Sequence, residues 1–257
     1  MSTVLAHTGF MTARHARNLI RQPWYVAFTL FIPVVYLVLF SQLFESVSQL
    51  PGFGTDYITF LTPGIAVMTA AFSAGWSGMG EYEDLDRGVL DRFLVSPASR
   101  TSLVAGRLVQ VGLVTAIQVA IIVLLGLIMG AGYPGGLVGI LVMLLAAVLV
   151  AVPIGAFSNS IALLLRQEES IIGVNQFLLL PLTFLSSIFM APALMPGWIR
   201  TASKFNPLTW AVETARSAVT GSPDWSLIGS RLAWLAILGA VTMWFAVRAF
   251  RAYQRSV

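Results

Sequence analysis

The stretch from Leu137 to Leu165 is LVGILVMLLAAVLVAVPIGAFSNSIALLL, and it contains no charged side chain. The hydrocarbon core of a bilayer is about 30 Å thick, and about 20 residues of α-helix are enough to cross it. A stretch this long can cross that core with a tilt or continue beyond it. It therefore predicts a transmembrane helix.

Five other stretches of the chain pass the same test of length and low charge. The predicted spans are about 24–44, 58–79, 103–129, 137–165, 171–190 and 227–247. Their only charged side chains are Arg107 and Arg231, each near the start of its span. We therefore expect an all-α integral membrane protein with six transmembrane helices. It would consist of an N-terminal segment (1–23), a six-helix domain (24–247) and a tail (248–257).

The composition excludes several other classes of protein. The chain has 257 residues, of which 57% are hydrophobic and 10% charged, whereas soluble domains have roughly 25% charged residues. A disordered chain would need low hydrophobicity and high charge. There is no cysteine, and both histidines, His7 and His15, precede the first predicted span. The one lysine, Lys204, follows no glycine-rich loop of the kind that holds nucleotide phosphates. We expect no catalytic residue, no metal site and no cofactor on this chain.

Lysine and arginine are distributed unevenly among the predicted connections. Eleven lie in or beside the N-terminal segment, the second and fourth connections and the tail, and four lie in or beside the fifth connection. Because cytoplasmic segments carry the excess of positive charge, both termini are predicted to be cytoplasmic. Since the arginines flank hydrophobic runs, they indicate membrane topology rather than nucleic-acid binding. Arginine usage favours a bacterial inner (plasma) membrane.

The predicted spans contain few polar groups at hydrocarbon depth. Ion-coupled carriers depend on intramembrane carboxylates, histidines or arginines, and none is predicted here. A membrane-embedded enzyme is disfavoured in the same way, because no paired carboxylates reach the membrane. The amides of Asn159, Asn175 and Gln176 either link helices to one another or, with Phe177, line a substrate path.

The second connection, EYEDLDRGVLDRFLVSPASR (81–100), places acidic residues before basic ones, the order that suits a helix dipole. Its apolar residues recur at helical spacing up to Pro97. They predict a cytoplasmic amphipathic helix that docks either on a protein or on lipid headgroups, and the acidic residues favour a protein. The candidate contacts are Glu81, Glu83, Asp84, Asp86, Arg87, Gly88, Leu90, Phe93 and Leu94. A second amphipathic helix, at the membrane surface, is predicted for about 4–22.

Four blocks of sequence resemble the type-2 ATP-binding-cassette (ABC) exporter permeases, in particular their daunorubicin-resistance-like multidrug branch. They are RNLIRQPWYVAFTLFIP (17–33), DRGVLDRFLVSPASR (86–100), LLLPLTFLSSIFM (178–190) with MPGW (195–198), and FNPLTWAVETAR (205–216). Val89 and the pair Asp86–Arg87 depart from the family's usual coupling-helix residues.

The resemblance implies a half-transporter. Two permease chains, identical or similar, would each dock a separate ATPase subunit that carries ATP and Mg²⁺. Residues 81–96 would act as the coupling helix, and Arg166, Glu168 and Glu169 would make a second contact with the ATPase. Residues 192–226 would form two short extracellular re-entrant helices.

The second of these short helices is also predicted by the residues themselves. Asn206 suits an N-cap, Pro207 suits the first helical position and Gly221 suits a C-cap. Glu213 and Arg216, three residues apart, are expected to pair.

The expected function is export of a hydrophobic or amphipathic, drug-like or lipid-like compound. The alternatives are export of a lipid-linked polysaccharide and, in a different class, ion-coupled secondary transport.

Overall fold

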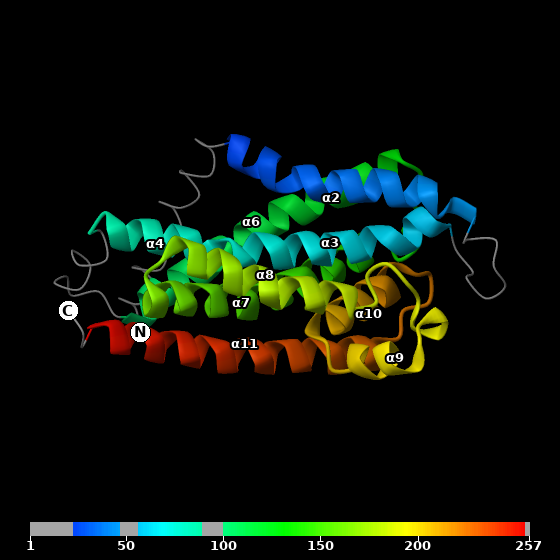
Figure 1. Ribbon diagram of the computed structural model, residues 1–257. Helices are drawn as coiled ribbons and strands as arrows, with labels where there is room; N and C mark the ends of the chain where they lie inside the picture. The colour runs from blue at the N-terminus through cyan, green and yellow to red at the C-terminus, as the bar shows by residue number, and fades with distance from the viewer. Residues whose placement is uncertain (1–22, 47–55, 89–99, 255–257) are drawn as a thin grey trace.

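The computed structural model describes residues 23–46, 56–88 and 100–254, and all regular structure within those ranges is helical. The long helices run side by side along one axis (Figure 1). Their bounds are α2 Pro23–Leu43, α3 Tyr57–Gly75, α4 Ser77–Asp86, α6 Arg100–Ile128, α7 Gly136–Leu165, α8 Glu168–Phe184 and α11 Trp225–Gln254. The short ones are the 3₁₀ helix η2 Pro192–Leu194, α9 Gly197–Ser203 and α10 Pro207–Val219.

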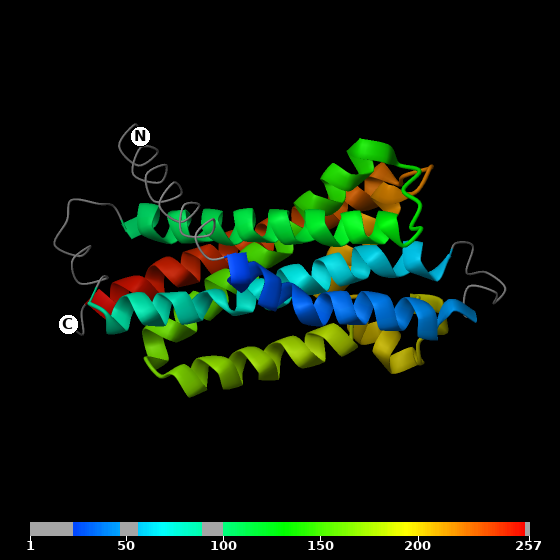
Figure 2. The ribbon, with the colours of Figure 1, turned by 90° about the horizontal axis from the view of Figure 1, so that it is seen from above.

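Helix α7, formed by the charge-free stretch, lies at the centre of the bundle and packs against α3, α4, α6, α8, α10 and α11. The two views of the ribbon agree on the arrangement of its ends (Figures 1 and 2). One end, here called the α4 end, carries α4, the α7–α8 connection and the last turns of α11. The opposite end, the α10 end, carries α9 and α10.

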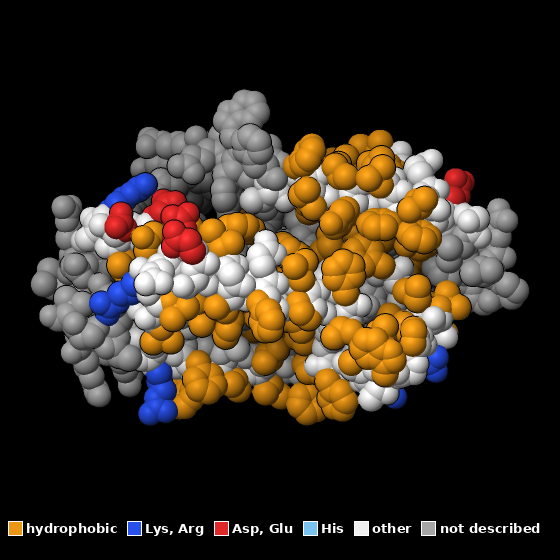
Figure 3. Space-filling model, in the orientation of Figure 1, with side chains coloured by type: hydrophobic (Ala, Val, Ile, Leu, Met, Phe, Trp, Pro, Cys, Tyr) orange, Lys and Arg blue, Asp and Glu red, His pale blue; other side chains and the backbone are white. Residues whose placement is uncertain are grey.

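The surface of the bundle is apolar between two charged ends. Hydrophobic side chains cover the middle of the face drawn in Figure 3, and charged side chains gather toward its ends. Large apolar side chains such as Phe177, Phe184 and Phe245 are more than half exposed. Such a belt suits lipid as the surrounding solvent, because a monomeric soluble protein rarely exposes so large an apolar patch.

Four helices are long and apolar enough to cross a membrane: Tyr57–Asp86, Ala105–Ile128, Gly136–Leu165 and Trp225–Phe250. A shorter apolar helix, Thr29–Leu43, corresponds to the first predicted span. The prediction of an all-helical membrane protein is confirmed for the described residues, while the count of six spans stays a prediction.

Three helix ends lie several residues from the predicted ones, and one of them is that of α11, which continues to Gln254 although the sixth span was expected to end at 247. The second span was expected to end near 79, but after a break at Trp76 the chain continues as α4 to Asp86. The fifth was expected to reach Met190, but α8 ends at Phe184 and residues 186–190 are not helical. Part of the predicted coupling helix, with Leu90, Phe93 and Leu94, lies outside the described residues. So does the predicted surface helix at about 4–22.

Helix α8 is attached to the rest of the bundle along one narrow stripe. Its buried residues recur at every fourth position: Ile171, Asn175, Leu179 and Thr183. Phe177 and Phe184, which lie off this stripe, are 83% and 69% exposed. Residues with this spacing share one side of a helix, so the fully buried contacts of α8 lie along one side of it.

Candidate functional site

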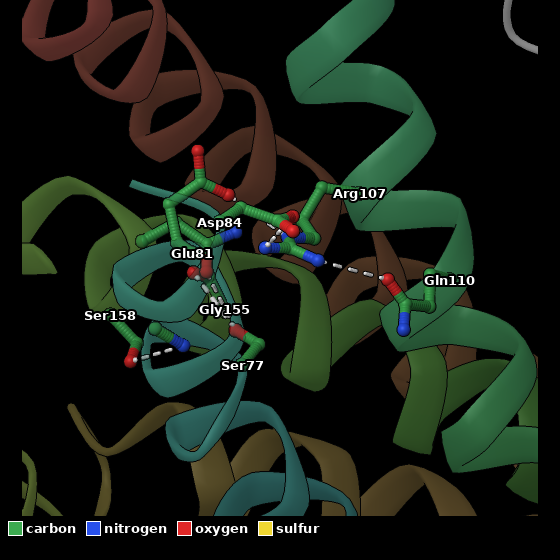
Figure 4. Close-up of polar contacts among 9 residues, drawn as sticks. Ser77, Glu81, Asp84, Arg107, Gln110, Gly155 and Ser158 are labelled. Carbon is green, nitrogen blue, oxygen red and sulfur yellow. Dashed lines mark hydrogen bonds and ion pairs between the residues drawn. The ribbon is translucent and has the colours of Figure 1, made fainter. Parts of the chain in front are cut away.

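An ion-pair cluster lies at the α4 end, between α4 and the first turns of α6 (Figure 4). Arg107 donates from Nε to Glu81 Oε2 at 2.9 Å and from Nη2 to Asp84 Oδ2 at 3.0 Å. Its Nη1 donates to Gln110 Oε1 at 3.4 Å. The side chains of Arg107 and Glu81 are only 12% and 11% exposed. Since one guanidinium holds both carboxylates, the cluster fixes α4 to α6.

Two candidate coupling residues belong to this cluster. Glu81 and Asp84, three residues apart, face the same side of α4, and both are bound to Arg107 within the chain. Arg107 was predicted only as a topology-determining charge. Its two partners precede it by 26 and 23 residues, so no local pattern in the sequence relates them.

The break between α3 and α4 is held by polar groups of α7 and α8. Ser77 Oγ donates to Asn159 Oδ1 at 3.0 Å, and the Gly78 amide donates to Ser158 Oγ at 3.1 Å. Ser158 Oγ donates in turn to Gly75 O. A Cβ at Gly78 would overlap Ser158, so the close approach of α4 to α7 requires glycine there. These bonds satisfy backbone groups that the break frees.

Asn175 on α8 joins the same network. Its Nδ2 donates to Gly75 O at 2.8 Å and to Ser158 Oγ at 3.0 Å. The side chains of Asn159 and Asn175 thus both make hydrogen bonds between helices. Asn175 Oδ1, however, is buried without a hydrogen-bond partner among the described residues.

A small groove with a cavity volume of about 10 Å³, partly open to the surroundings, lies where α8 meets the α3–α4 break. Asn175 and Gln176 line it, whereas Asn159 and Phe177 do not. Aromatic and aliphatic side chains form most of its remaining wall: Phe72, Trp76, Met79, Ile171, Ile172 and Leu179.

The other candidate contacts at the α4 end are exposed. Arg166 ends α7 in a left-handed conformation (φ 52°), and Glu168 and Glu169 form the first turn of α8, where the helix dipole favours negative charge. On α4, Asp86 is exposed, and Glu83 forms an exposed ion pair with Arg87 at 3.4 Å. Gly88 then turns the chain with a φ of +65°. Exposed charges from α4 and the α7–α8 connection thus lie at the same end of the bundle.

The predicted short helices are present at the α10 end as α9 and α10. Asn206 caps α10, since its Oδ1 accepts from the Leu208 amide at 2.9 Å, and Pro207 is the first helical residue. Both predictions are confirmed. The predicted C-cap is wrong, because Thr220 rather than Gly221 occupies that position.

The expected pairing of Glu213 with Arg216 is also wrong. Glu213 Oε2 lies 2.8 Å from Arg231 Nη2 on α11, in an ion pair that joins α10 to α11. Arg216 instead binds backbone carbonyl groups of two other segments. Glu213 and Arg216 therefore each bind groups on other segments rather than each other.

Arg216 connects α10 to α3 and to the non-helical residues that follow α8. Its Nε donates to Phe60 O at 3.0 Å, Nη1 to Ser187 O at 2.6 Å and Nη2 to Ile188 O at 2.7 Å. The guanidinium also lies 3.4 Å from the centre of the Phe60 ring, within range of a cation–π interaction.

Other polar side chains hold the same non-helical segment. Tyr57 Oη donates to Phe189 O at 3.0 Å, and Thr209 Oγ1 accepts from the Ser187 amide at 3.2 Å. Beside this segment, Asn206 Nδ2 donates to Leu182 O in the last turn of α8 at 2.6 Å. Irregular backbone is tolerated at membrane depth only when its polar groups are satisfied. These donors explain why α8 can end several residues earlier than its hydrophobicity predicts.

Within residues 23–46, 56–88 and 100–254, no group of three or more His, Asp or Glu side chains could hold a metal ion.

Comparison with known proteins found one matching family model. It is described as ABC-2 type transporter and matches residues 7–220. The daunorubicin resistance ABC transporter permease protein DrrB1 of Streptomyces coeruleorubidus is 27% identical over 220 residues, which are 86% of this chain and 77% of that protein. The putative transport permease ycf38 of Cyanophora paradoxa is 32% identical over 186 residues, or 72% of this chain and 64% of that protein. The protein of the same name from Porphyra purpurea is 29% identical, over 79% of this chain and 70% of its own length.

Proposed function

The chain belongs to the ABC-2 type transporter membrane family, and on that premise we propose that it exports a hydrophobic or amphipathic, drug-like or lipid-like compound. It is a multi-pass membrane protein and an ABC transporter permease, and its family implies partnership with an ABC ATPase subunit. The observation that carries the proposed substrate class is the similarity, over most of the chain, to a permease named for daunorubicin resistance.

The complete exporter would contain two copies of the ATPase subunit, which hold ATP and Mg²⁺, and a second permease chain, identical or similar. The chain would lie in a bacterial inner membrane with both termini and the α4 end in the cytoplasm. The excess of lysine and arginine beside the corresponding connections supports this orientation.

The coupling surface that we propose consists of Glu83, Asp86, Arg87, Glu168 and Glu169 at the α4 end. Behind it, α4 is fixed to α6 by Arg107 and to α7 by Ser158. Asn175 fixes α8 to the same break. We expect a displacement of this surface by the ATPase to move α3, α6, α7 and α8 together, because direct hydrogen bonds and ion pairs join these helices to α4 and to the break before it.

The docking test is a double charge reversal, Glu168→Arg with Glu169→Arg. It should lower co-purification of the co-expressed ATPase by about tenfold or more, because like charges or lost complementarity at an interface cost several kcal/mol. The matched control is Lys204→Glu, an exposed charge reversal at the α10 end, which should leave co-purification unchanged. Undiminished binding of the double variant would refute the docking surface. Failure of the unaltered chain to bind any ABC ATPase would refute the proposed function itself.

The groove beside α8 is our proposed substrate contact. Its wall is mostly apolar, which favours a drug-like or lipid-like compound over the alternative of a glycan. Asn175, whose buried Oδ1 has no hydrogen-bond partner among the described residues, is the polar residue of the groove wall nearest the α3–α4 break. An ion-coupled carrier, the alternative of a different class, would transport without the ATPase.

Filling the groove tests this assignment. Ile172→Trp places a large ring in the groove and should raise the substrate concentration for half-maximal ATP-driven transport by about tenfold. Phe177→Trp, on the same helix but outside the groove, should leave that concentration unchanged. An equal response of the two variants would show that the groove takes no part in substrate binding.

A further inference from the structure

Two buried side chains on α6 form a polar position that neither the ion-pair cluster nor the groove includes. Thr115 and Gln118 lie near the middle of α6, and both are 0% exposed. Gln118 Nε2 donates to Thr29 Oγ1 on α2 at 2.8 Å. Thr115 Oγ1 and Gln118 Oε1 have no hydrogen-bond partner among the described protein groups. Two oxygens on neighbouring turns of one helix are thus buried without a donor.

The Thr115 hydroxyl differs in its hydrogen bonding from the hydroxyls of other threonines in these helices. Most bond their hydroxyl to the carbonyl four residues earlier, as Thr62, Thr69, Thr183, Thr214 and Thr242 do at 2.7–2.9 Å. That local bond is the readiest way to satisfy a hydroxyl inside a helix. Thr115 does not make it. In an apolar interior, an unsatisfied polar group is costly, so its hydroxyl needs another partner.

The side-chain amide of Gln118 has an unpaired end whichever way its oxygen and nitrogen are assigned. With either orientation one end of the amide contacts Thr29 and the other end is left without a partner. A water molecule can donate to an amide oxygen or accept from an amide nitrogen, and it can do either with a hydroxyl. Side chains three residues apart on a helix have Cβ atoms about 5–6 Å apart. Two hydrogen bonds of about 2.8 Å from one oxygen span such a gap.

We infer that one internal water molecule is bound at this position and bridges Thr115 Oγ1 to the side-chain amide of Gln118, beside the contact of α2 with α6. Buried waters bind where several otherwise unsatisfied polar groups converge. Because both side chains are completely buried, the position takes water rather than part of a larger solute. This inference is independent of the transport function proposed above.

A double-mutant cycle on the purified chain tests the bridge through thermal unfolding. Thr115→Val keeps the shape of the side chain and removes the hydroxyl, and it should lower Tm by about 2–4 °C. In a Gln118→Leu background, where the water has lost its other anchor, the same substitution should have little effect or raise Tm. Thr115→Ser retains the hydroxyl and should stay close to the unaltered protein.

The control is Thr69→Val, which removes a buried hydroxyl already bonded to Ile65 O at 2.8 Å. Its effect should be the same in both backgrounds, because distant sites add. The inference is overturned if Thr115→Val raises Tm in the unaltered chain. It is also overturned if Thr115→Val changes Tm by the same amount in the unaltered chain and in the Gln118→Leu background. Should Gln118→Leu not fold, an experimental density map that resolves ordered water decides the question. Density within hydrogen-bond distance of both side chains supports the bridge, and its absence overturns it.

Discussion

Replacement of Arg216 by alanine is expected to lower the free energy of unfolding by about 4 kcal/mol or more. Hydrogen bonds to charged groups contribute about 1.5–3 kcal/mol each, and Arg216 makes three of them, to Phe60 O, Ser187 O and Ile188 O. Alanine would remove the donor from the non-helical carbonyl groups of Ser187 and Ile188 and would also remove the contact with the Phe60 ring. For a chain of this size the loss corresponds to a fall in Tm of about 10 °C, measurable by circular dichroism in detergent.

Two further variants separate the geometry of Arg216 from its charge. Arg216→Lys keeps the charge but replaces a planar fork by a single ammonium group, so it should recover less than half of the loss. Arg200→Ala is the matched control, because Arg200 also binds two backbone carbonyls, Ala193 O and Met195 O, but is exposed. It should cost about 1 kcal/mol or less. Equal losses for Arg216→Ala and Arg200→Ala would contradict the role given to Arg216.

Replacement of Arg107 by leucine should destabilise the chain by about 3–5 kcal/mol, the usual result of removing one partner from a buried ion pair. Glu81 and Asp84 would then remain beside each other with no counter-charge from Arg107. Since α4 would no longer be fixed to α6, ATP-driven transport should fall more than ATPase co-purification does. Thermal unfolding, a transport assay and a pull-down on the same preparation measure the three quantities.

The penalty should shrink when the stranded carboxylates are neutralised. In a Glu81→Gln, Asp84→Asn background, Arg107→Leu should cost less than half as much, because no unpaired negative charge remains. Arg87→Ala is the exposed control, since its partner Glu83 is also exposed, and such pairs contribute about 0–1 kcal/mol. If Arg107→Leu is as harmless as Arg87→Ala, the cluster does not fix α4.

The sequence predicts those parts of the fold that depend on local composition. Long charge-free runs are sufficient to place the apolar helices, because a single segment can satisfy its own backbone groups in hydrocarbon only as a helix. The start of α10 is equally local, since the Asn206 side chain caps a helix that Pro207 begins. Both features follow from residues a few positions apart.

What the sequence did not predict depends on contacts between distant segments. Glu213 was expected to pair with Arg216 because the two are neighbours on a helix, yet each finds a partner on another segment. The helix break at Trp76 has the same origin, since the groups that hold it come from α7 and α8. Rules for pairing between neighbours on a helix come from isolated helices surrounded by water. Helix α10 is instead surrounded by other segments of the protein, which offer its charged side chains alternative partners.

The four-residue spacing of the buried positions on α8 has a practical consequence. Tolerance to substitution along this helix should rise and fall with the same period, with losses concentrated at Ile171, Asn175, Leu179 and Thr183. The chain has no native cysteine, so a thiol introduced at any intervening position would be its one site of maleimide labelling. Spin labels or fluorophores could therefore be placed turn by turn along α8 without first removing any reactive residue.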